Sequence, residues 1–476
     1  MTASRLIDVF DPRTGLVDLR LTVPDPEEVR SLAGRLRSAQ PAWHALGLEG
    51  RIAVMQRWAK AIESHADSII AADSRDTGFG QISRIAPAMM QGFLRGTCAQ
   101  APAQWAAAVR AGVSRTQPHV HYDSVLKPFA LVGVISPWNA PTMLSMLHAI
   151  PPLVAGCAVL VKPSEVTPRF AAAIKSSFAD IPELRAVFDF VLGDGATGAA
   201  VIDNIDLLSF TGSVPNGRRV AEACARRLIP CELELGGKDP IVITATANLE
   251  DAVSATIRGA LTSTGQVCFS IERVYVERPL HEAFVKAVVE RAAKIRLNYP
   301  NPLEGQLGPF ISLRQADIVD AHLDDALAKG ARLVAGGKSE TLGGGRYMRP
   351  TVLTNVNHSM IIMREETFGP VIPVMAYDTP EEAVALANDT SFGLSAAVMA
   401  GTEEEARAIG ERINAGNTSL QDAFLTFAAG PAEADSWGAS GLGGKRSGIQ
   451  RYLKRQALLL NTAKPTCLTT EDLTAA

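Results

Sequence analysis

The sequence predicts an α/β protein built on doubly wound parallel sheets. Short apolar runs that suit buried parallel strands recur from about residue 129, and stretches with helical periodicity separate them. Strands that alternate with helices in this way form right-handed βαβ units. The chain has 476 residues, of which 47% are hydrophobic, and at about 150 residues per domain it is long enough for two or three domains.

The region before residue 110 is predicted to be mainly helical. Asp25 is a candidate N-cap, with Pro26 at the first helical position of a helix that continues towards Ala39. Residues 49–70 carry apolar side chains at helical spacing, and residues 89–109 predict a further long helix.

Four short apolar runs follow and predict the strands of a first parallel sheet. They are residues 129–135, 158–161, 188–192 and 206–210. Ligands of such sheets bind at the carboxyl ends of the strands. Two loops at predicted strand ends, residues 162–165 and 211–213, are therefore candidate ligand loops.

A second α/β unit is predicted to begin near Asp239. Asn248 can cap a helix that runs to about Thr262, and a strand is expected at residues 273–276. Residues 428–444 are rich in Gly, Ala and Ser and predict a long loop, which is either a linker or a binding loop.

The composition excludes several classes of function. The formal net charge is −4, with 46 basic and 50 acidic residues intermixed, so no basic stripe indicates nucleic acid binding. None of the six cysteines forms a C-x-x-C pair, and we predict no metal site. Residues 1–15 lack the apolar core of a signal peptide, and prolines interrupt the apolar residues 128–161. We expect a cytoplasmic protein with reduced thiols and no membrane partner.

Cys268 and Glu234 are the residues that say most about function. Cys268 ends the string Thr-Gly-Gln-Val-Cys, and Glu234 begins the string Glu-Leu-Gly-Gly-Lys. A thiol offers a nucleophile, a carboxylate offers a general base, and the glycines let a backbone approach a ligand closely. The pair suggests covalent catalysis through a thioester that is then hydrolysed. A buried structural thiol and a solvated surface carboxylate are the alternatives.

Six strings, in order along the chain, resemble the aldehyde dehydrogenase superfamily over essentially the whole sequence. They are SPWNAP at 136–141, KPSE at 162–165, FTGS at 210–213, LELGGK at 233–238, GQVC at 265–268 and EETFGP at 365–370. The resemblance implies two doubly wound Rossmann-like domains and a small β extension used in oligomers. It assigns residues 1–110 and 129–236 to an NAD-binding domain, 237–445 to a catalytic domain, and 111–128 and 456–470 to the oligomerisation or bridging extension.

The resemblance implies an NAD(P)-dependent aldehyde dehydrogenase. Cys268 is then the nucleophile that forms a thiohemiacetal and a thioester, and Glu234 is the general base for hydrolysis of the thioester. Asn139, with the backbone N–H of Cys268, stabilises the oxyanion. Lys162 is also assigned to the catalytic set.

A larger set of residues is implied to surround the dinucleotide. These are Ile135, Ser136, Trp138, Lys162, Ser164, Glu165, Gly195, Phe210, Thr211, Gly212, Ser213, Leu235, Glu366 and Phe368. Lys162 and Glu165 match positions near the adenosine ribose, where a carboxylate repels a 2′-phosphate, so NAD is favoured over NADP. Ser213 is placed where a helix N-terminus meets the pyrophosphate. Glu366 and Phe368 match the residues that hold the nicotinamide ribose and ring.

The substrate is less well defined by the sequence. Phe269 follows the cysteine where relatives have small residues, and the aromatic that often precedes the C-terminal Gly-Gly is missing, so Trp437 or Phe269 is expected to replace it. These apolar candidates favour an aromatic or medium-chain hydrophobic aldehyde. A semialdehyde dehydrogenase with an acidic substrate remains an alternative, with Arg95 or Arg446 as its anchor.

Two further alternatives remain open from the sequence. A cysteine esterase would use Cys268 without a cofactor, although no histidine lies near it in the sequence. A non-catalytic relative would have no reason to keep Cys268, Glu234 and Asn139. For partners, we expect a small-molecule aldehyde and a second copy of the chain, as a homodimer or homotetramer.

Overall fold

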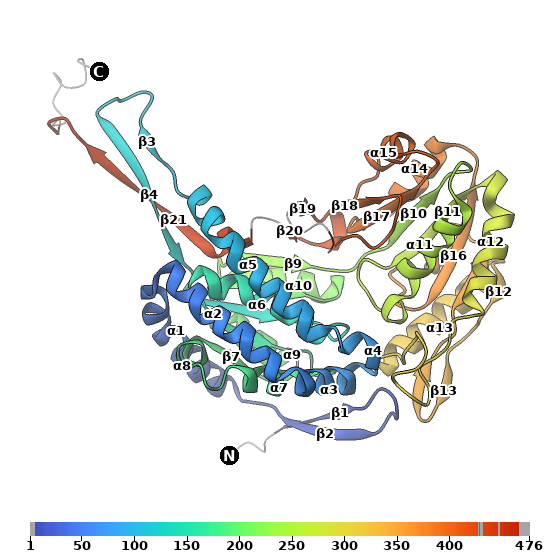
Figure 1. Ribbon diagram of the computed structural model, residues 1–476, viewed down its shortest axis with the longest axis horizontal. Helices are drawn as coiled ribbons and strands as arrows, with labels where there is room; N and C mark the ends of the chain where they lie inside the picture. Colours follow the sequence, from blue (N-terminus) through green and yellow to red (C-terminus); the bar gives the residue numbers. More distant parts are fainter. Residues whose placement is uncertain (1–4, 427, 429–431, 446–447, 466–476) are drawn as a thin grey trace.

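The computed structural model describes residues 5–426, 428, 432–445 and 448–465, and it contains two large sheets and a projecting arm (Figure 1). A β-hairpin and a group of helices come first in the chain. They are β1 (Leu6–Phe10), β2 (Val17–Thr22), α1 (Pro26–Ala45), α2 (Gly47–Ser64), α3 (Ala66–Thr77), α4 (Gly80–Ser83) and α5 (Ala86–Ala108). Asp25 caps α1 as predicted, because its carboxylate accepts the N–H groups of Glu27 and Glu28. The single helix expected at 49–70 is two helices, α2 and α3, which meet at His65.

The first sheet is parallel and has the strand order β7-β6-β5-β8-β9. Its strands are β5 (Leu131–Ile135), β6 (Ala158–Lys162), β7 (Phe188–Phe190), β8 (Leu207–Thr211) and β9 (Cys231–Glu234). The helices between them are α6 (Pro141–Ala155), α7 (Phe170–Ser177), α8 (Pro182–Val187), α9 (Gly195–Ile202) and α10 (Val214–Arg226). The chain starts in the middle strand, β5, and winds outwards to both edges, which is the order of a doubly wound nucleotide-binding sheet.

The second sheet has the order β12-β15-β16-β11-β10-β17-β18, and only β12 is antiparallel to its neighbour. Its strands are β10 (Asp239–Ile243), β11 (Ile271–Glu277), β12 (Arg332–Ala335), β15 (Thr351–Thr354), β16 (Val371–Tyr377), β17 (Ser395–Met399) and β18 (Asn417–Leu420). Its main helices are α11 (Leu249–Leu261), α12 (Arg278–Ala292), α13 (Leu313–Ala328), α14 (Pro380–Asn388) and α15 (Glu403–Gly410).

Both faces of this second sheet are buried. In β10, Val242 belongs to one hydrophobic cluster and its neighbours Ile241 and Ile243 belong to the other. In β11, Tyr275 and Val274 divide in the same way. Successive residues of a strand point to opposite faces, so continuous apolar runs such as these require cover on both sides.

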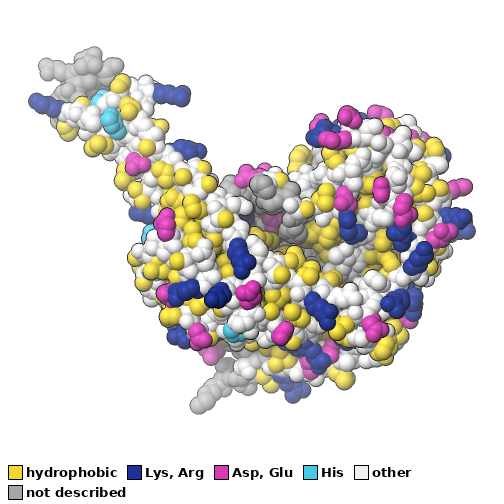
Figure 2. Space-filling model, in the orientation of Figure 1, with side chains coloured by type: hydrophobic (Ala, Val, Ile, Leu, Met, Phe, Trp, Pro, Cys, Tyr) yellow, Lys and Arg dark blue, Asp and Glu magenta, His cyan; other side chains and the backbone are white. Residues whose placement is uncertain are grey.

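A three-stranded antiparallel sheet forms the arm that leaves the body of the molecule (Figures 1 and 2). It consists of β3 (Ala111–Val113), β4 (Val120–Pro128) and β21 (Leu453–Asn461), in the order β21-β4-β3. β21 begins at Leu453, before residue 456, where the extension implied by the resemblance starts, and residues 466–470 of that extension lie outside the described residues. The division of roles among the predicted domains stays a prediction.

Short elements complete the part of the chain that the structure describes. They are the 3-10 helices η1 (Thr262–Gly265), η2 (Ile361–Met363), η3 (Gly438–Ser440) and η4 (Gly448–Tyr452), and the strands β13 (Glu340–Leu342), β14 (Gly345–Tyr347), β19 (Ala434–Asp435) and β20 (Gly444–Lys445). In the described ranges, no helix is long and apolar enough to cross a membrane.

Candidate active site

Cys268 lies in a firmly held loop between η1 and β11, and its side chain is partly exposed. The side chain of Gln266 is buried; its Oε1 accepts the N–H of Ile311 at 3.0 Å and its Nε2 donates to the Pro309 carbonyl at 3.2 Å. Thr264 Oγ1 bonds both the N–H and the carbonyl of Gly308. The loop is thereby fixed to the segment that precedes α13, which positions the thiol.

The two glycines of the LELGGK string are required by close approaches. A Cβ on Gly237 would lie 2.3 Å from the backbone oxygen of Cys268, and a Cβ on Gly236 would lie 2.5 Å from Glu366 Oε2. The N–H of Gly237 donates to Glu366 Oε1 at 3.1 Å. This segment therefore joins the cysteine loop to the loop that carries Glu366.

Asn139 comes from the loop between β5 and α6, and its side chain is buried. Its Nδ2 donates to the carbonyl of Gln266 at 2.9 Å. The amide therefore reaches across to the cysteine loop and does not serve its own turn. The structure thus places the Asn139 amide against the carbonyl two residues before Cys268, and its role in oxyanion stabilisation stays a prediction.

Glu234 ends β9 and is half-buried. The described part of the predicted long loop packs over it: the segment forms a bridge between Gly441 and Glu234, and Ser436 Oγ donates to Glu234 Oε2 at 3.5 Å. A Cβ on Gly443 would lie 2.5 Å from Glu234 Oε1. This loop is thus part of the site and is not a linker between domains.

The electrostatic surroundings of Cys268 differ from the electropositive pocket that a thiolate would favour. Burial raises the pKa of the Cys268 thiol, and the carboxylates of Glu366, Asp239 and Glu234 raise it further. Burial, together with the nearby charge of Glu272, raises the pKa of Glu366 to about 8. Among the described residues, the charged groups that act on the pKa of this thiol are therefore carboxylates, and all of them favour the protonated form.

The predicted cofactor residues gather where strands of the first sheet end. Ile135 pairs with Lys162 on one side and with Phe210 on the other, so three carboxyl ends lie side by side. Lys162 is buried and its Nζ lies 2.9 Å from Glu165 Oε2. Ser136 is also buried at this edge, and its N–H donates to the Lys162 carbonyl.

The N-terminus of α10 fits a phosphate group. Ser213 is its N-cap, but the Ser213 side chain makes no capping hydrogen bond, which leaves first-turn N–H groups for a ligand. Thr211, just before it, bonds His148 Nε2 at 3.1 Å. Gly195 begins α9, where Asp194 already accepts the N–H groups of the first turn. The residues present at α10 therefore fit a dinucleotide, whereas the α9 end is occupied by a side chain.

The remaining predicted residues divide between the two sides of the site. Trp138 and Phe368 meet edge to face, with ring centroids 5.4 Å apart. Leu235 packs against Gly217 of α10, where a Cβ would lie 2.5 Å from Leu235 Cδ2. Ser164 Oγ accepts the N–H of Val166 within its own turn. For Lys162, no contact with Cys268 is seen among the described residues.

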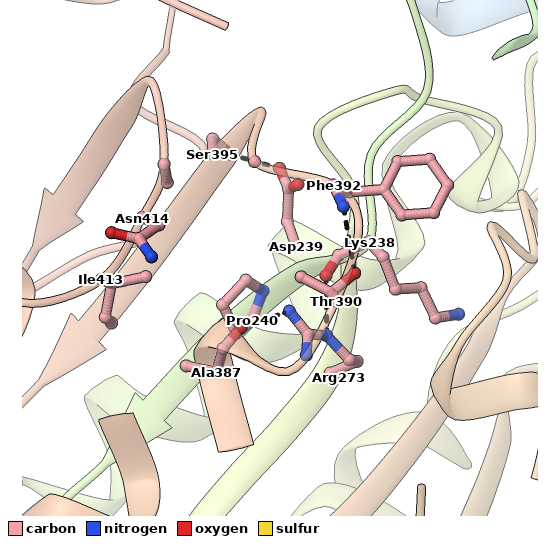
Figure 3. A pocket seen from close by; sticks show the side chains of 12 residues that line it. Lys238, Asp239, Pro240, Arg273, Ala387, Thr390, Phe392, Ser395, Ile413 and Asn414 are labelled. Carbon is pink, nitrogen blue, oxygen red and sulfur yellow. Dashed lines mark hydrogen bonds between the residues drawn. The ribbon is translucent and has the colours of Figure 1, made fainter. Parts of the chain in front are cut away.

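Several buried side chains behind the cysteine were missed by the sequence reasoning. Lys238 Nζ lies 2.6 Å from Glu272 Oε2, and both side chains are buried. Arg273 is fully buried and donates to the carbonyls of Lys238 and Ala387. Burial raises the pKa of Asp239 to about 8, and its carboxyl accepts the Ser395 hydroxyl. Lys238, Asp239, Arg273 and Ser395 line a cavity of about 10 Å³ between β10, β11 and β17 (Figure 3). The available signal was the charged Glu-Arg pair that interrupts the apolar strand β11.

A second cavity, of about 60 Å³, lies beside Asn139. It is lined mainly by apolar side chains from the α3–α4 region, α5 and α6, namely Phe79, Ile82, Ile85, Ala86, Met89, Ala140 and Met143, with Asp73, Thr77 and Ser263. Phe269 is buried and packs on Phe424 at 4.5 Å, a contact that the sequence did not indicate. Trp437 is half exposed.

The fold and the site together define a class of protein. The doubly wound sheet has a helix N-terminus free for a nucleotide, and the neighbouring loop carries a cysteine close to an amide and to carboxylates. This combination is typical of nucleotide-dependent enzymes with a covalent nucleophile. The chain belongs to the aldehyde dehydrogenase family, whose sequence model, described as "Aldehyde dehydrogenase family", matches residues 1–458.

Relatives and solved structures agree with this membership. The chain is 35% identical over 470 residues to a Mycolicibacterium smegmatis protein named "Putative succinate-semialdehyde dehydrogenase", with NADP+ in its name; the match covers 94% of this chain and 87% of that protein. A solved structure from Anabaena variabilis, called a "Putative Aldehyde Dehydrogenase", is 46% identical with a TM-score of 0.94, covering 98% of this chain and 99% of that one. Betaine aldehyde dehydrogenase from Staphylococcus aureus in complex with NAD+ is 27% identical with a TM-score of 0.91, covering 98% and 93%. The predicted family, fold class and enzyme class are confirmed.

Proposed function

We propose that this chain oxidises an apolar aldehyde, aromatic or of medium chain length, to the carboxylic acid with an NAD(P)+ cofactor. The observation that carries the proposal is the apolar cavity beside Asn139, which is close to the cysteine loop. Ligand sites of this kind combine apolar walls with a few polar groups that fix orientation.

The chain's own residues divide the reaction between them. Cys268 Sγ attacks the aldehyde carbon and forms a thiohemiacetal. The Asn139 amide and the backbone N–H of Cys268 stabilise the oxygen that becomes negative, a contribution of about 3 kcal/mol per donor in comparable sites. The dinucleotide supplies a hydride acceptor and a positively charged ring. Loss of a hydride would convert the thiohemiacetal into a thioester on Cys268. Glu234 would then take a proton from the water that attacks the thioester carbon, the C–S bond would break, and the acid and the thiol would be released.

The cavity favours an apolar substrate over an acidic one. None of the residues that line it is Lys or Arg, and its carboxyl, Asp73, has a pKa raised by burial. A carboxylate tail placed there would be desolvated without a cation, which is costly. Arg95 is exposed on α5, and Arg446 lies outside the described residues. A semialdehyde substrate remains the second candidate because of the name of the Mycolicibacterium smegmatis relative.

We propose NAD+ as the preferred cofactor. The support is Glu165, whose carboxylate stands beside Lys162 at the end of β6 and would repel a 2′-phosphate. The Lys162–Glu165 ion pair offsets part of that repulsion, so we expect NADP+ to be used as well, but with a lower kcat/KM than NAD+.

We also propose that the arm joins two or more copies of this chain, in the cytoplasm. Leu459 and Leu460 of β21 are 72% and 62% exposed, and Leu458 is 47% exposed. Apolar side chains in a row on an edge strand favour association with another chain.

The experiment measures formation of reduced nicotinamide with NAD+ and NADP+ against aromatic, aliphatic and acidic aldehydes. Wild type, Cys268→Ala and the matched variant Cys231→Ala, which removes another partly exposed thiol, are compared. We expect turnover of apolar aldehydes by wild type and Cys231→Ala only. A best rate with succinate semialdehyde would select the second candidate. Equal rates from wild type and Cys268→Ala would exclude Cys268 as the nucleophile, and ester cleavage without cofactor as the main activity would favour an esterase.

A further inference from the structure

Three segments meet at one buried carboxylate, Glu272: its own strand β11, the segment of the two glycines and the loop of Glu366. The residue lies in β11, shortly after Cys268, and is only 3% exposed. Its Oε2 accepts Lys238 Nζ at 2.6 Å and the N–H of Thr367 at 2.7 Å, and its Oε1 accepts the N–H of Phe368 at 2.7 Å. One side chain therefore binds the segment of the two glycines and the loop of Glu366.

The charges of this cluster are compensated. Lys238 is also buried, and its ammonium group donates both to Glu272 and to Thr367 Oγ1, the latter at 3.0 Å. From α13, Gln315 Nε2 donates to the Thr367 carbonyl at 2.8 Å. A buried carboxylate is tolerated when a cation and several donors satisfy it, and it is costly when one of them is removed.

The loop that Glu272 holds has a backbone that needs support. Phe368 has a φ of +55°, a left-handed conformation that costs a non-glycine residue about 1 kcal/mol or more. The Phe368 ring packs edge to face on Trp138, the neighbour of Asn139. Glu366 is held from the other side by the N–H of Gly237. Fixing two successive N–H groups at 367 and 368 therefore sets where the Glu366 carboxylate and the Phe368 ring point.

We propose that Glu272 is a positioning residue that holds Glu366 and Phe368 in the arrangement that receives the nicotinamide ribose and ring. The inference rests on the proposed function, because it concerns cofactor binding at the same site. Glu272 touches neither substrate nor cofactor and acts through the backbone of residues 366–368.

The test replaces Glu272 with Gln, which keeps the shape but removes the charge and turns an amide N–H₂ towards a donor. We expect the Kd for NAD+, measured by tryptophan fluorescence without aldehyde, to rise about tenfold or more. The KM for NAD+ should rise with it, while the KM for aldehyde stays within about twofold. Hydrogen exchange in a peptide that covers residues 364–370 should be faster in the cofactor-free variant.

The matched control is Asp76→Asn. Asp76 is also a buried carboxylate that accepts hydrogen bonds from one cation, Arg169, and from one backbone N–H, that of Phe170. Neither partner belongs to residues 366–368 or to the segments that hold them. It should lower stability without changing the Kd for NAD+. If Glu272→Gln does not fold, the double variant Lys238→Met/Glu272→Gln removes both buried charges and is measured in its place.

Different outcomes separate this proposal from the proposed function. If wild type binds neither NAD+ nor NADP+, the proposed function fails and the positioning role fails with it. If wild type binds NAD+ and the Glu272 variant binds it equally well, with unchanged exchange at 364–370, only the positioning role is overturned and Glu272 is a structural residue like Asp76.

Discussion

Gly237→Ala tests how closely the cysteine loop and the glycine segment are fitted. The added Cβ would lie 2.3 Å from the Cys268 oxygen and 2.7 Å from Asp239 Oδ1, whereas distances under 3.0 Å force a shift. The Cys268 backbone or its neighbour must therefore move by about 0.7 Å, the difference between 3.0 and 2.3 Å. Displacements of about 1 Å at a reacting group cost about 100-fold in rate, and overpacking costs about 1–3 kcal/mol in stability.

The assay for Gly237→Ala combines three measurements: kcat/KM for the best aldehyde, alkylation of Cys268 by iodoacetamide without cofactor, and urea unfolding. We expect a loss of about 100-fold in kcat/KM, with a smaller change in alkylation, because alkylation needs no oxyanion donors. Gly34→Ala is the control, since a Cβ at Gly34 meets nothing within 4 Å. A Gly237→Ala enzyme with wild-type kcat/KM would refute the reasoning that this contact positions the nucleophile.

Three further predictions follow from the contacts and charges of the site. Asn139→Ala should lower kcat about 100- to 1000-fold because an oxyanion donor is lost, and should lower the free energy of unfolding by about 1 kcal/mol because the hydrogen bond to the Gln266 carbonyl is lost. Steady-state kinetics measure the first effect and urea unfolding the second. A fall in kcat of less than about fivefold would contradict the oxyanion role. The pKa of Glu366 is raised from 4.5 to about 8, so the contribution of its protonated form to the free energy of unfolding is fully present below pH 4.5 and is lost as the pH rises through 8. Glu366→Gln should flatten this decline when unfolding is measured at several pH values, and at pH 9 it should speed alkylation of Cys268. An unchanged dependence of the unfolding free energy on pH would contradict a buried carboxyl at this position. Glu165→Ser should shift the ratio of kcat/KM for NADP+ to that for NAD+ about tenfold or more towards NADP+, and an unchanged ratio would remove Glu165 as the selector.

The fold was predictable because its signals are local and repeated. Strands such as β5 and β6 are short, apolar and separated by helices, so their period and spacing appear in the sequence itself. The break between α2 and α3 at His65 was missed, since no proline or glycine marks it and the apolar spacing continues across it. The bounds of β21 could not be predicted from its residues, because β21 is mostly exposed and carries little burial pattern.

Residues of the candidate site could be predicted from the sequence only where they belong to short sequence motifs. Cys268, Glu234 and Asn139 could be named as candidates because they stand in motifs that resemble the family's, and the structure adds the contacts between their segments. Glu272 and Phe424 act through partners far away in the chain, so no pattern along the sequence could pair them with Lys238 or Phe269. Their role appears only after folding brings β10, β11 and the 365–370 loop together.

The same long-range arrangement explains why no cation contributes to the pKa shift of the Cys268 thiol among the described residues. Lys238 and Arg273 belong to the segments next to the cysteine loop, but their donors are already engaged by Glu272, Thr367 and backbone carbonyls. The groups that act on Cys268 are Glu366, Asp239 and Glu234, which favour the protonated thiol when they are ionised. A thiol kept protonated is poorly nucleophilic. On the proposed function, a positively charged nicotinamide ring bound beside Glu366 would offset the negative charge of those carboxylates, so we expect Cys268 to be alkylated faster with NAD+ bound than without it.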